Sequence, residues 1–149
     1  METPTVQVIA AAPTPPGRLR TLPVLYVEDN EVNVILMQAM AGKRPQVQLL
    51  VARSGAEAVA AARQTRPLLV LMDMNLGDCH GTELIGRMRT ERPDAGTMYV
   101  AVSAEASSEQ INLALRHGFD RYLTKPLRLD ALLALFDELD QKVLGANPI

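Results

Sequence analysis

The sequence predicts an α/β fold in which a five-stranded parallel sheet has a helix between each pair of successive strands. Two observations lead to this prediction. From Pro23 onward, short apolar runs alternate with longer amphipathic segments, which is the pattern of consecutive βαβ units. The chain has 149 residues, of which 48% are hydrophobic and 21% charged, the size and composition of one domain with a single core. The sequence contains no evident internal repeat.

Five short apolar runs are the expected strands. A segment expected to be helical follows each of them. Most of these segments have helical periodicity, and the second is recognised mainly by its capping residues and its alanines. Such segments are long enough for a crossover to a parallel neighbour. The strands are expected at Val24–Val27, Val47–Val51, Leu68–Met72, Met98–Val102 and Arg121–Leu123.

The first helix follows the first strand and ends near Gly42 and Pro45, two residues that disfavour its continuation. Apolar residues recur along it at intervals of three and four, and we expect the face that they form to pack in the core. This face consists of Val32, Ile35, Leu36, Ala39 and Met40.

Capping signals mark two further helices. Ser54 stands three residues before Glu57, a capping box that opens an alanine-rich helix ending near Thr65. Ser107 and Gln110 have the same spacing and open another helix. The remaining helices are a shorter one over residues 82–90 and a last one with apolar positions at Leu129, Leu132, Leu133, Phe136, Leu139 and Val143.

The expected domain covers residues 22–144, with a short C-terminal tail over 145–149. Five of the ten prolines fall within the first 23 residues, so residues 1–21 are expected to form a poorly ordered arm. The patch VQVIAAA within this arm is the exception, because it could instead add a strand to the sheet or contact another subunit.

Charge, cysteine content and hydropathy argue against several classes of function. Lys and Arg total 15 against 17 for Asp and Glu, a net charge of −2, which gives no electrostatic footprint for a nucleic-acid backbone. No apolar stretch approaches the roughly 20 residues that a membrane-spanning helix needs. The single cysteine, Cys79, has no partner for an internal disulfide, which fits a reducing compartment. We therefore expect a cytoplasmic protein without direct nucleic-acid binding or membrane insertion.

Four of the five expected strands lead into residues with charged or nucleophilic groups. Glu28 and Asp29 follow the first strand, Asp73 the third, Ser103 the fourth and Lys125 the fifth. In an open parallel sheet, ligands bind outside the carboxyl ends of the strands, where loops and helix N-termini meet. We therefore expect these five side chains to form one site.

The chemistry of this set points to phosphoryl transfer. Three carboxylates at one edge repel one another and have raised pKa values unless a cation binds. Mg²⁺ prefers such oxygen ligands and combines them with phosphate oxygens. Ser103 and Lys125 supply the donors that an anion beside the metal requires. Asp73 would then be the nucleophile that forms an acyl phosphate.

Four stretches of the sequence resemble the receiver domain of two-component response regulators. They are VLYVEDNEVN at 24–33, LVLMDMNLGDCHG at 69–81, VAVSA at 100–104 and GFDRYLTKP at 118–126. The resemblance extends from about Leu22 to Val143, and the DNEVN form is similar to receivers attached to hybrid histidine kinases. It implies a flavodoxin-like (βα)5 fold, with strand order 2-1-3-4-5 and helices on both faces of the sheet.

The resemblance also assigns roles to residues of the site. Asp73 would be the phosphoacceptor, and Ser103 and Lys125 would each contact a phosphoryl oxygen. Mg²⁺ would be held by Glu28, Asp29, Asp73 and the backbone carbonyl of Asn75.

Further residues have roles by the same resemblance. Lys125 and Pro126 would be joined by a cis peptide, and Tyr122 would be an aromatic switch that turns when Ser103 moves. Asn75 and Glu105 would tune loss of the phosphoryl group to water, which we expect within minutes rather than days. The family usually has a proline where Gly77 stands, so the loop GDCHG is expected to be more mobile.

Partners follow from the resemblance as well. A histidine kinase or a histidine phosphotransfer protein would donate the phosphoryl group, and the chain would catalyse its own phosphorylation and dephosphorylation without being an enzyme for other substrates. The surface of the fourth helix, fifth strand and fifth helix would switch, contact a downstream effector that the sequence does not name, and serve as a candidate homodimer contact.

Two other classes of function compete with this one. Hydrolases of the haloacid dehalogenase type also place a nucleophilic aspartate at a strand end, but they typically carry a second aspartate two residues later, where this chain has Asn75. A docking scaffold that works without phosphorylation would not require the acidic pair, Asp73, Ser103 and Lys125 together. A flavin-binding function is disfavoured because no phosphate-binding loop follows the first strand.

Overall fold

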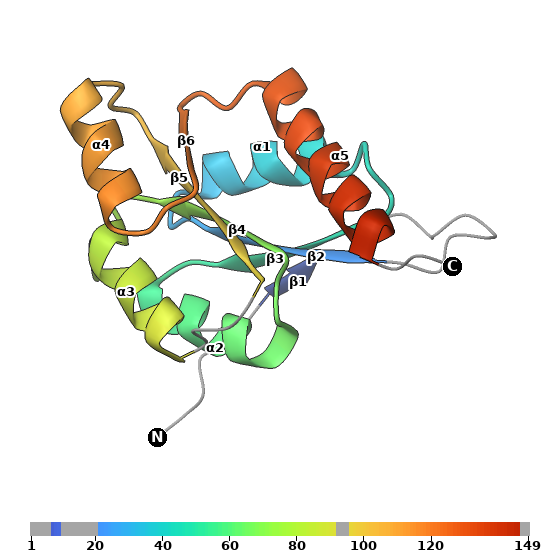
Figure 1. Cartoon of the computed structure of the whole chain (residues 1–149), viewed down its shortest axis with the longest axis horizontal. Coiled ribbons are helices and arrows are strands. Elements are labelled where there is room, and N and C mark those ends of the chain that lie inside the picture. Colours follow the sequence, from blue (N-terminus) through green and yellow to red (C-terminus); the bar gives the residue numbers. More distant parts are fainter. Residues whose placement is uncertain (1–6, 10–20, 92–95, 147–149) are drawn as a thin grey trace.

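The computed structural model describes residues 7–9, 21–91 and 96–146. These residues form one sheet and the helices that pack on it (Figure 1). The strands are β1 (Gln7–Ile9), β2 (Leu22–Val27), β3 (Val47–Ala52), β4 (Leu69–Asp73), β5 (Met98–Ser103) and β6 (Arg121–Thr124). The helices are α1 (Glu31–Ala41), α2 (Gly55–Thr65), α3 (Gly81–Glu91), α4 (Ser108–Arg116) and α5 (Leu129–Ala146).

The five strands from β2 to β6 are parallel and lie in the order β3-β2-β4-β5-β6. Counted along the chain, this is the order 2-1-3-4-5, so the predicted fold is confirmed. The order changes direction between β2 and β4, which are hydrogen-bonded neighbours. The loops after these two strands therefore meet at the switch point of the sheet, where ligands bind in such folds.

β1 is a sixth strand, antiparallel to β3 at the edge of the sheet, with Val8 opposite Leu50. The expectation of a poorly ordered arm was therefore wrong for residues 7–9, where the added strand is formed instead. Its short apolar run can pair with the edge of β3, which has no other hydrogen-bonding neighbour on that side among the described strands. Of the rest of the expected arm, residues 1–6 and 10–20 lie outside the described residues.

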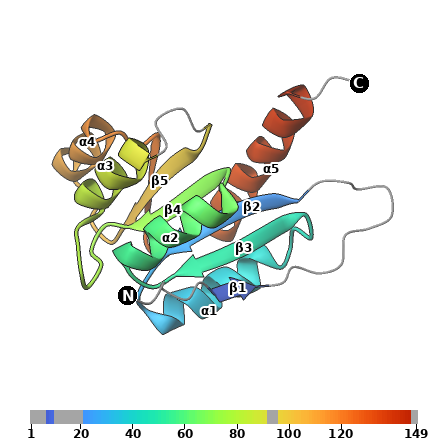
Figure 2. The ribbon, with the colours of Figure 1, turned by 90° about the horizontal axis from the view of Figure 1, so that it is seen from below.

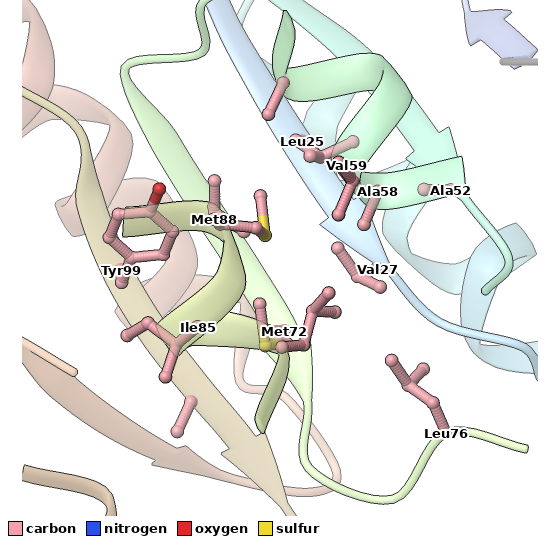
Figure 3. Packing of buried hydrophobic residues seen from close by; sticks show 14 of the residues in the cluster. Leu25, Val27, Ala52, Ala58, Val59, Met72, Leu76, Ile85, Met88 and Tyr99 are labelled. Atoms are coloured by element: carbon pink, nitrogen blue, oxygen red, sulfur yellow. The ribbon is translucent and has the colours of Figure 1, made fainter. Parts of the chain in front are cut away.

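Helices cover both faces of the sheet, α1 and α5 on one and α2, α3 and α4 on the other (Figures 1 and 2). Successive side chains of a strand point to opposite faces, so each strand contributes to both cores. Figure 3 shows the core beneath α2 and α3, where Leu25 and Val27 of β2 lie near Ala58 and Val59. The intervening residue, Tyr26, belongs to the core beneath α1 and α5.

The predicted core face of α1 was wrong, although the helix itself is present. Val32, Ile35 and Leu36 are 64%, 54% and 52% exposed, and Ala39 is exposed as well. Only Met40 of the predicted face is half-buried against the core. The residues of α1 that the core buries are Val34, Met37 and Ala41. Both sets recur at helical spacing because α1 is apolar around most of its circumference, so periodicity alone could not distinguish them.

The ends of the domain also differ slightly from the prediction. α5 continues through Gly145 to Ala146, so the first two residues of the expected C-terminal tail belong to the helix. Residues 147–149 lie outside the described part of the chain. Within the described residues, none of the helices is both long and apolar enough to cross a membrane.

Candidate functional site

The carboxyl edge of the sheet brings the predicted acidic residues together. Glu28 directly follows β2, and its backbone N–H donates to the carbonyl of Ala52 at 2.9 Å, which extends the β2–β3 pairing by one bond. Asp73 is the last residue of β4, which pairs with β2. Glu28, Asp29 and Asp73 each offer one carboxylate oxygen, and these oxygens lie within 4.8 Å of one another. This is the spatial arrangement that the sequence predicts.

Lys125 lies at the same place, directly after β6. Its Nζ is 2.8 Å from Oε1 of Glu28 and 3.4 Å from Oδ2 of Asp73. Glu28 is completely buried and Asp73 is 6% exposed, whereas Asp29 is exposed. The peptide bond between Lys125 and Pro126 is cis, as the resemblance to receiver domains implies. Two buried carboxylates therefore share one ammonium group, which leaves a net negative charge in the pocket.

The two oxygens of Glu28 have different surroundings. Oε1 accepts hydrogen bonds from the hydroxyl of Tyr26 at 3.1 Å, the amide of Asn33 at 2.8 Å and Nζ of Lys125. Oε2 is buried and accepts no hydrogen bond within the described structure. A buried carboxylate oxygen without a partner is energetically costly, so it favours a bound cation. The unpartnered Oε2 indicates that the pocket fits a cation. Mg²⁺ is a suitable one, because the other candidate ligands are also hard oxygens.

Asp73 and Glu28 respond to this environment in opposite directions. Burial, followed by the contact with the Glu28 carboxylate, raises the pKa of Asp73 to about 6. Burial also acts to raise the pKa of Glu28, but the close contact with the Asp73 carboxyl and the hydrogen bonds from Lys125 and Asn33 outweigh burial and lower that pKa. For Lys125, the two carboxylates outweigh the effect of burial and raise its pKa. Lys125 and Glu28 therefore stay charged, and Asp73 is the group that titrates.

Ser103 is the buried last residue of β5 and lies beside Lys125. Its carbonyl accepts a hydrogen bond from the backbone N–H of Lys125 at 2.8 Å. Its Oγ accepts from the backbone N–H of Glu105 at 3.2 Å, and the carbonyl of Glu105 accepts from the hydroxyl of Tyr122 at 2.6 Å. Glu105 therefore links the hydroxyl of Ser103 to the half-buried ring of Tyr122.

The loop between β4 and α3, residues 74–80, contacts two of the acidic residues. The backbone N–H of Asn75 donates to Oδ1 of Asp73 at 3.2 Å. The backbone N–H of Gly77 donates to Oδ2 of Asp29 at 3.1 Å. The side chain of Asn75 is exposed two residues after Asp73. The loop thus joins the end of β4 to the start of α1.

Asp78 attaches the same loop to α2. Both of its carboxylate oxygens lie 3.0 Å from the backbone nitrogen of Gly55, the first residue of α2, and accept its N–H. This hydrogen bond is the main cause that lowers the pKa of Asp78. A Cβ atom at position 55 would lie 2.6 Å from Sγ of Cys79 and 3.2 Å from Oδ2 of Asp78, so a larger residue there would displace these two side chains of the loop.

Sequence reasoning missed four residues that hold these groups in place: Tyr26, Asn33, Gly77 and Asp78. Asn33 had a detectable signal, since it lies one helical turn after Asn30, the residue that caps α1. Tyr26 has the pattern of an ordinary strand residue. The backbone N–H of Gly77 and the loop-to-helix bond of Asp78 depend on tertiary contacts, which leave no local pattern in a sequence.

An open parallel sheet with three carboxylates, a hydroxyl and a lysine at its carboxyl edge defines a class of proteins, the signalling modules of two-component systems and phosphorelays. The chain belongs to one family within this class, the response regulator receiver domains, whose sequence model matches residues 24–137. The resemblance inferred from the motifs is thereby confirmed.

Known proteins of two kinds are similar to this chain. The probable transcriptional regulatory protein TcrX of Mycobacterium tuberculosis is 35% identical over 117 residues, which are 74% of this chain and 49% of TcrX. The sensor protein GacS of Pseudomonas syringae is 34% identical over 116 residues, 76% of this chain and 13% of GacS. The chain therefore spans about half of the first relative and a small part of the second.

A similar solved structure contains a phosphotransfer partner. It is the complex of the Saccharomyces cerevisiae histidine phosphotransfer protein Ypd1 with the receiver domain of its downstream response regulator Ssk1. The match has a TM-score of 0.67 and 28% identity, and it covers 76% of this chain and 84% of the other.

Proposed function

We propose that this receiver uses Mg²⁺ to take a phosphoryl group from a phosphohistidine onto Asp73. The observation that carries the proposal is the convergence of three carboxylates within 4.8 Å of one another, with Lys125 within 3.4 Å of Asp73. The buried, unpartnered Oε2 of Glu28 supports a divalent cation at this place. The assignment of Asp73 as phosphoacceptor rests on its position at the end of β4, beside both the cation ligands and the lysine.

In the transfer, a carboxylate oxygen of Asp73 attacks the phosphorus atom of the donor. A P–O bond forms while the P–N bond to the donor imidazole breaks, and the electron pair of that bond stays on the ring nitrogen. Lys125 neutralises charge on a phosphoryl oxygen, because its ammonium already lies beside Asp73. Glu28, Asp29, Asp73 and the backbone carbonyl of Asn75 would hold Mg²⁺, which when bound offsets charge on the phosphoryl oxygens.

The acyl phosphate is then lost to water within minutes. Water attacks phosphorus, the bond to Asp73 breaks, the carboxylate is regenerated and inorganic phosphate leaves. The side chains of Asn75 and Glu105 are both exposed on loops next to the site, where they would orient that water. The chain thus catalyses only its own phosphorylation and dephosphorylation. A phosphorylated form that survives overnight in Mg²⁺ would contradict this step.

Ser103 and Tyr122 are the proposed switch. A phosphoryl group on Asp73 offers Ser103 a charged acceptor, toward which its hydroxyl turns. Because Ser103 and Tyr122 are both bonded to Glu105, this movement changes the contact that holds the Tyr122 ring. Tyr122 belongs to β6, so the change reaches the surface of α4, β6 and α5. Phosphorylation then shifts the balance between two conformations of that surface.

The direct test uses a small phosphodonor. The full chain is incubated with acetyl phosphate and Mg²⁺, and its intact mass is measured. The wild type should gain one phosphoryl group, and Asp73→Asn should gain none. Asp137→Asn is the matched control, since Asp137 is an exposed aspartate on α5 paired with Arg44 and should not affect the reaction. A wild type without any added phosphoryl group would overturn the proposal.

The phosphodonor protein is proposed to be a histidine kinase or a histidine phosphotransfer protein that docks on α1. The exposed side chains of Val32, Ile35 and Leu36 form an apolar surface of a kind that usually marks a contact with another protein. α1 begins two residues after Asp29, so this surface borders the pocket. Leu36 also lines a pocket together with Lys125 and Pro126, which makes the surface continuous with the site.

A charge-introducing test separates docking from chemistry. Ile35→Glu should slow transfer from a phosphorylated histidine phosphotransfer protein at least about tenfold, since it places a charge in the apolar contact. Transfer from acetyl phosphate should be unchanged, because that donor needs no protein surface. Leu144→Glu is the matched control, since Leu144 is similarly exposed, at 45%, near the far end of α5. Equal transfer by all three proteins would exclude α1 as the docking surface.

We propose that the protein is cytoplasmic. After phosphorylation, its surface of α4, β6 and α5 would contact a second copy of the chain. β6 is the edge strand opposite β1, and Arg121 on it pairs with Glu138 of α5. Leu115 of α4 is 43% exposed nearby. Sedimentation velocity with and without acetyl phosphate tests this contact, and a monomer under both conditions would exclude the homodimer.

A further inference from the structure

Asp29 differs from the other acidic residues of the pocket in how it is held. Burial fixes Glu28 and Asp73 in place, whereas Asp29 is exposed and its side chain would otherwise rotate freely. An exposed ligand that is free to rotate must lose this freedom when a cation binds, and that loss weakens the binding. Some other feature has to hold Asp29 if it is to be ready for a metal.

The backbone N–H of Gly77 supplies this restraint. It donates to Oδ2 of Asp29 at 3.1 Å, and Asp29 accepts no other hydrogen bond in the part of the chain that the structure describes. The two residues lie 48 positions apart in the sequence. The bond therefore connects two loops that follow neighbouring strands, β2 and β4, across the mouth of the pocket.

The donor is itself well positioned. The loop closes on itself through the N–H of Leu76, which donates to the carbonyl of Cys79 at 3.2 Å, and through the N–H of Gly81, which donates to the carbonyl of Met74 at 2.9 Å. Asp78 then fixes the loop to Gly55 of α2. A donor on a loop with three anchors can orient a side chain without much further loss of entropy.

The property that matters at position 77 is the backbone N–H. The space around this position does not require glycine, because it would accommodate a Cβ atom. A Cβ atom there would lie 3.6 Å from Oδ2 of Asp29, an ordinary van der Waals contact. Alanine would therefore keep the hydrogen bond, whereas proline has no N–H to donate. The two substitutions form a matched pair that separates the hydrogen bond from the side chain.

We propose that the backbone N–H of Gly77 is a positioning group for the divalent cation, acting through Asp29. This proposal rests on the Mg²⁺ site proposed above. It gives a structural meaning to the departure of this chain from the proline that the family usually has. The loop contributes directly to the orientation of a metal ligand.

Metal binding is measured by isothermal titration calorimetry, with MgCl₂ added to the full chain without any phosphodonor. Gly77→Pro should raise the Kd for Mg²⁺ about tenfold, the lower end of effects seen when the support of a metal ligand is removed. Gly77→Ala should stay within about twofold of the wild type, since it keeps the N–H. In an Asp29→Ala background, Gly77→Pro should have no further effect, because the residue through which it acts is gone.

A second measurement does not depend on metal or on proline. Hydrogen exchange of the Gly77 amide, followed by NMR, should become faster in Asp29→Ala. It should not change in Glu31→Ala, where the removed carboxylate pairs with Arg53 instead.

The outcomes are distinguishable. If the wild type binds Mg²⁺ and Gly77→Pro binds it equally well, the positioning role is wrong and the metal site stands. The positioning role is also wrong if Gly77→Pro weakens binding to the same extent without Asp29, because the loop would then act by another route. If the wild type binds no Mg²⁺, the proposed metal site fails together with this role, whatever the exchange rate of the Gly77 amide.

Discussion

Asp73 and Asp78 stand on one continuous strand and loop, yet the fold treats their charges in opposite ways. Asp73 is 6% exposed and lies against Glu28, and burial above all raises its pKa to about 6. Asp78 is exposed and accepts the N–H of Gly55 at the start of α2, which lowers its pKa. Ionisation of the first destabilises the fold, and ionisation of the second stabilises it.

The difference shows how the fold holds together a site whose carboxylates repel one another. The proposed phosphoryl transfer requires an ionised Asp73 beside other carboxylates, an arrangement that costs folding free energy until a cation binds. Asp78 contributes in the opposite direction, because a negative charge at a helix N-terminus is favourable. Asp78 stabilises the loop that follows Asp73. It therefore offsets part of the folding free energy that the ionised Asp73 costs.

The largest expected effect tests the first half of this comparison. Asp73→Asn should raise the free energy of unfolding by about 1–3 kcal/mol at pH 7.5, because it removes a buried charge with a pKa shifted upward. Urea unfolding followed by circular dichroism, in buffer without divalent cations, measures the change. Unchanged or reduced stability would mean that the carboxylate of Asp73 is compensated in the fold.

The pH dependence of this effect has a definite sign. The ordinary pKa of 3.8 applies to Asp73 in the unfolded chain and a pKa of about 6 in the folded chain, so the folded state binds the proton more tightly. The penalty is therefore complete above pH 6 and disappears as the pH falls toward 3.8. The stability advantage of Asp73→Asn should shrink over this range. An advantage that is the same at pH 7.5 and pH 4.5 would have another origin.

Magnesium should relieve the same repulsion. If the proposed site exists, Mg²⁺ at ten times its Kd stabilises the folded wild type by about 1.4 kcal/mol. The melting temperature of the wild type should rise accordingly, whereas that of Asp73→Asn should rise less because one carboxylate ligand is missing. NaCl at equal ionic strength is the control. A melting curve that Mg²⁺ leaves unchanged would argue against the metal site.

The sequence predicted those parts of the fold that leave a local pattern. Parallel strands followed by helices can be recognised from alternating apolar runs, and Ser54 and Ser107 cap helices as expected. The orientation of α1 could not be recognised, because Val34 and Val32 are chemically equivalent and only the packing of α1 against β3 and α5 buries the first. The pairing of β1 with β3 likewise depends on an edge that the sequence does not reveal.

For the site, the sequence identified the groups that carry charge, and the resemblance assigned their roles. Glu28, Asp73 and Lys125 meet because each stands at the end of a parallel strand, which is a property of topology. The groups that orient them were not predicted. Asn33 and Gly77 act through hydrogen bonds between segments whose separation is known only once the chain has folded.

The smallest expected effect tests the second half of the comparison. Asp78→Asn should lower the free energy of unfolding at pH 7.5 by about 0.5–1 kcal/mol, a modest change because the carboxylate is exposed at its helix N-terminus. Asparagine keeps one acceptor oxygen for Gly55 but loses the charge.

Because the pKa of Asp78 is lowered on folding, its stabilising contribution is present above the ordinary value of 3.8 and is lost as the pH falls through the folded value. The same urea experiment should thus give opposite signs for Asp73→Asn and Asp78→Asn at pH 7.5. A stabilising Asp78→Asn would mean that the loop, like the pocket, is strained by its own charge.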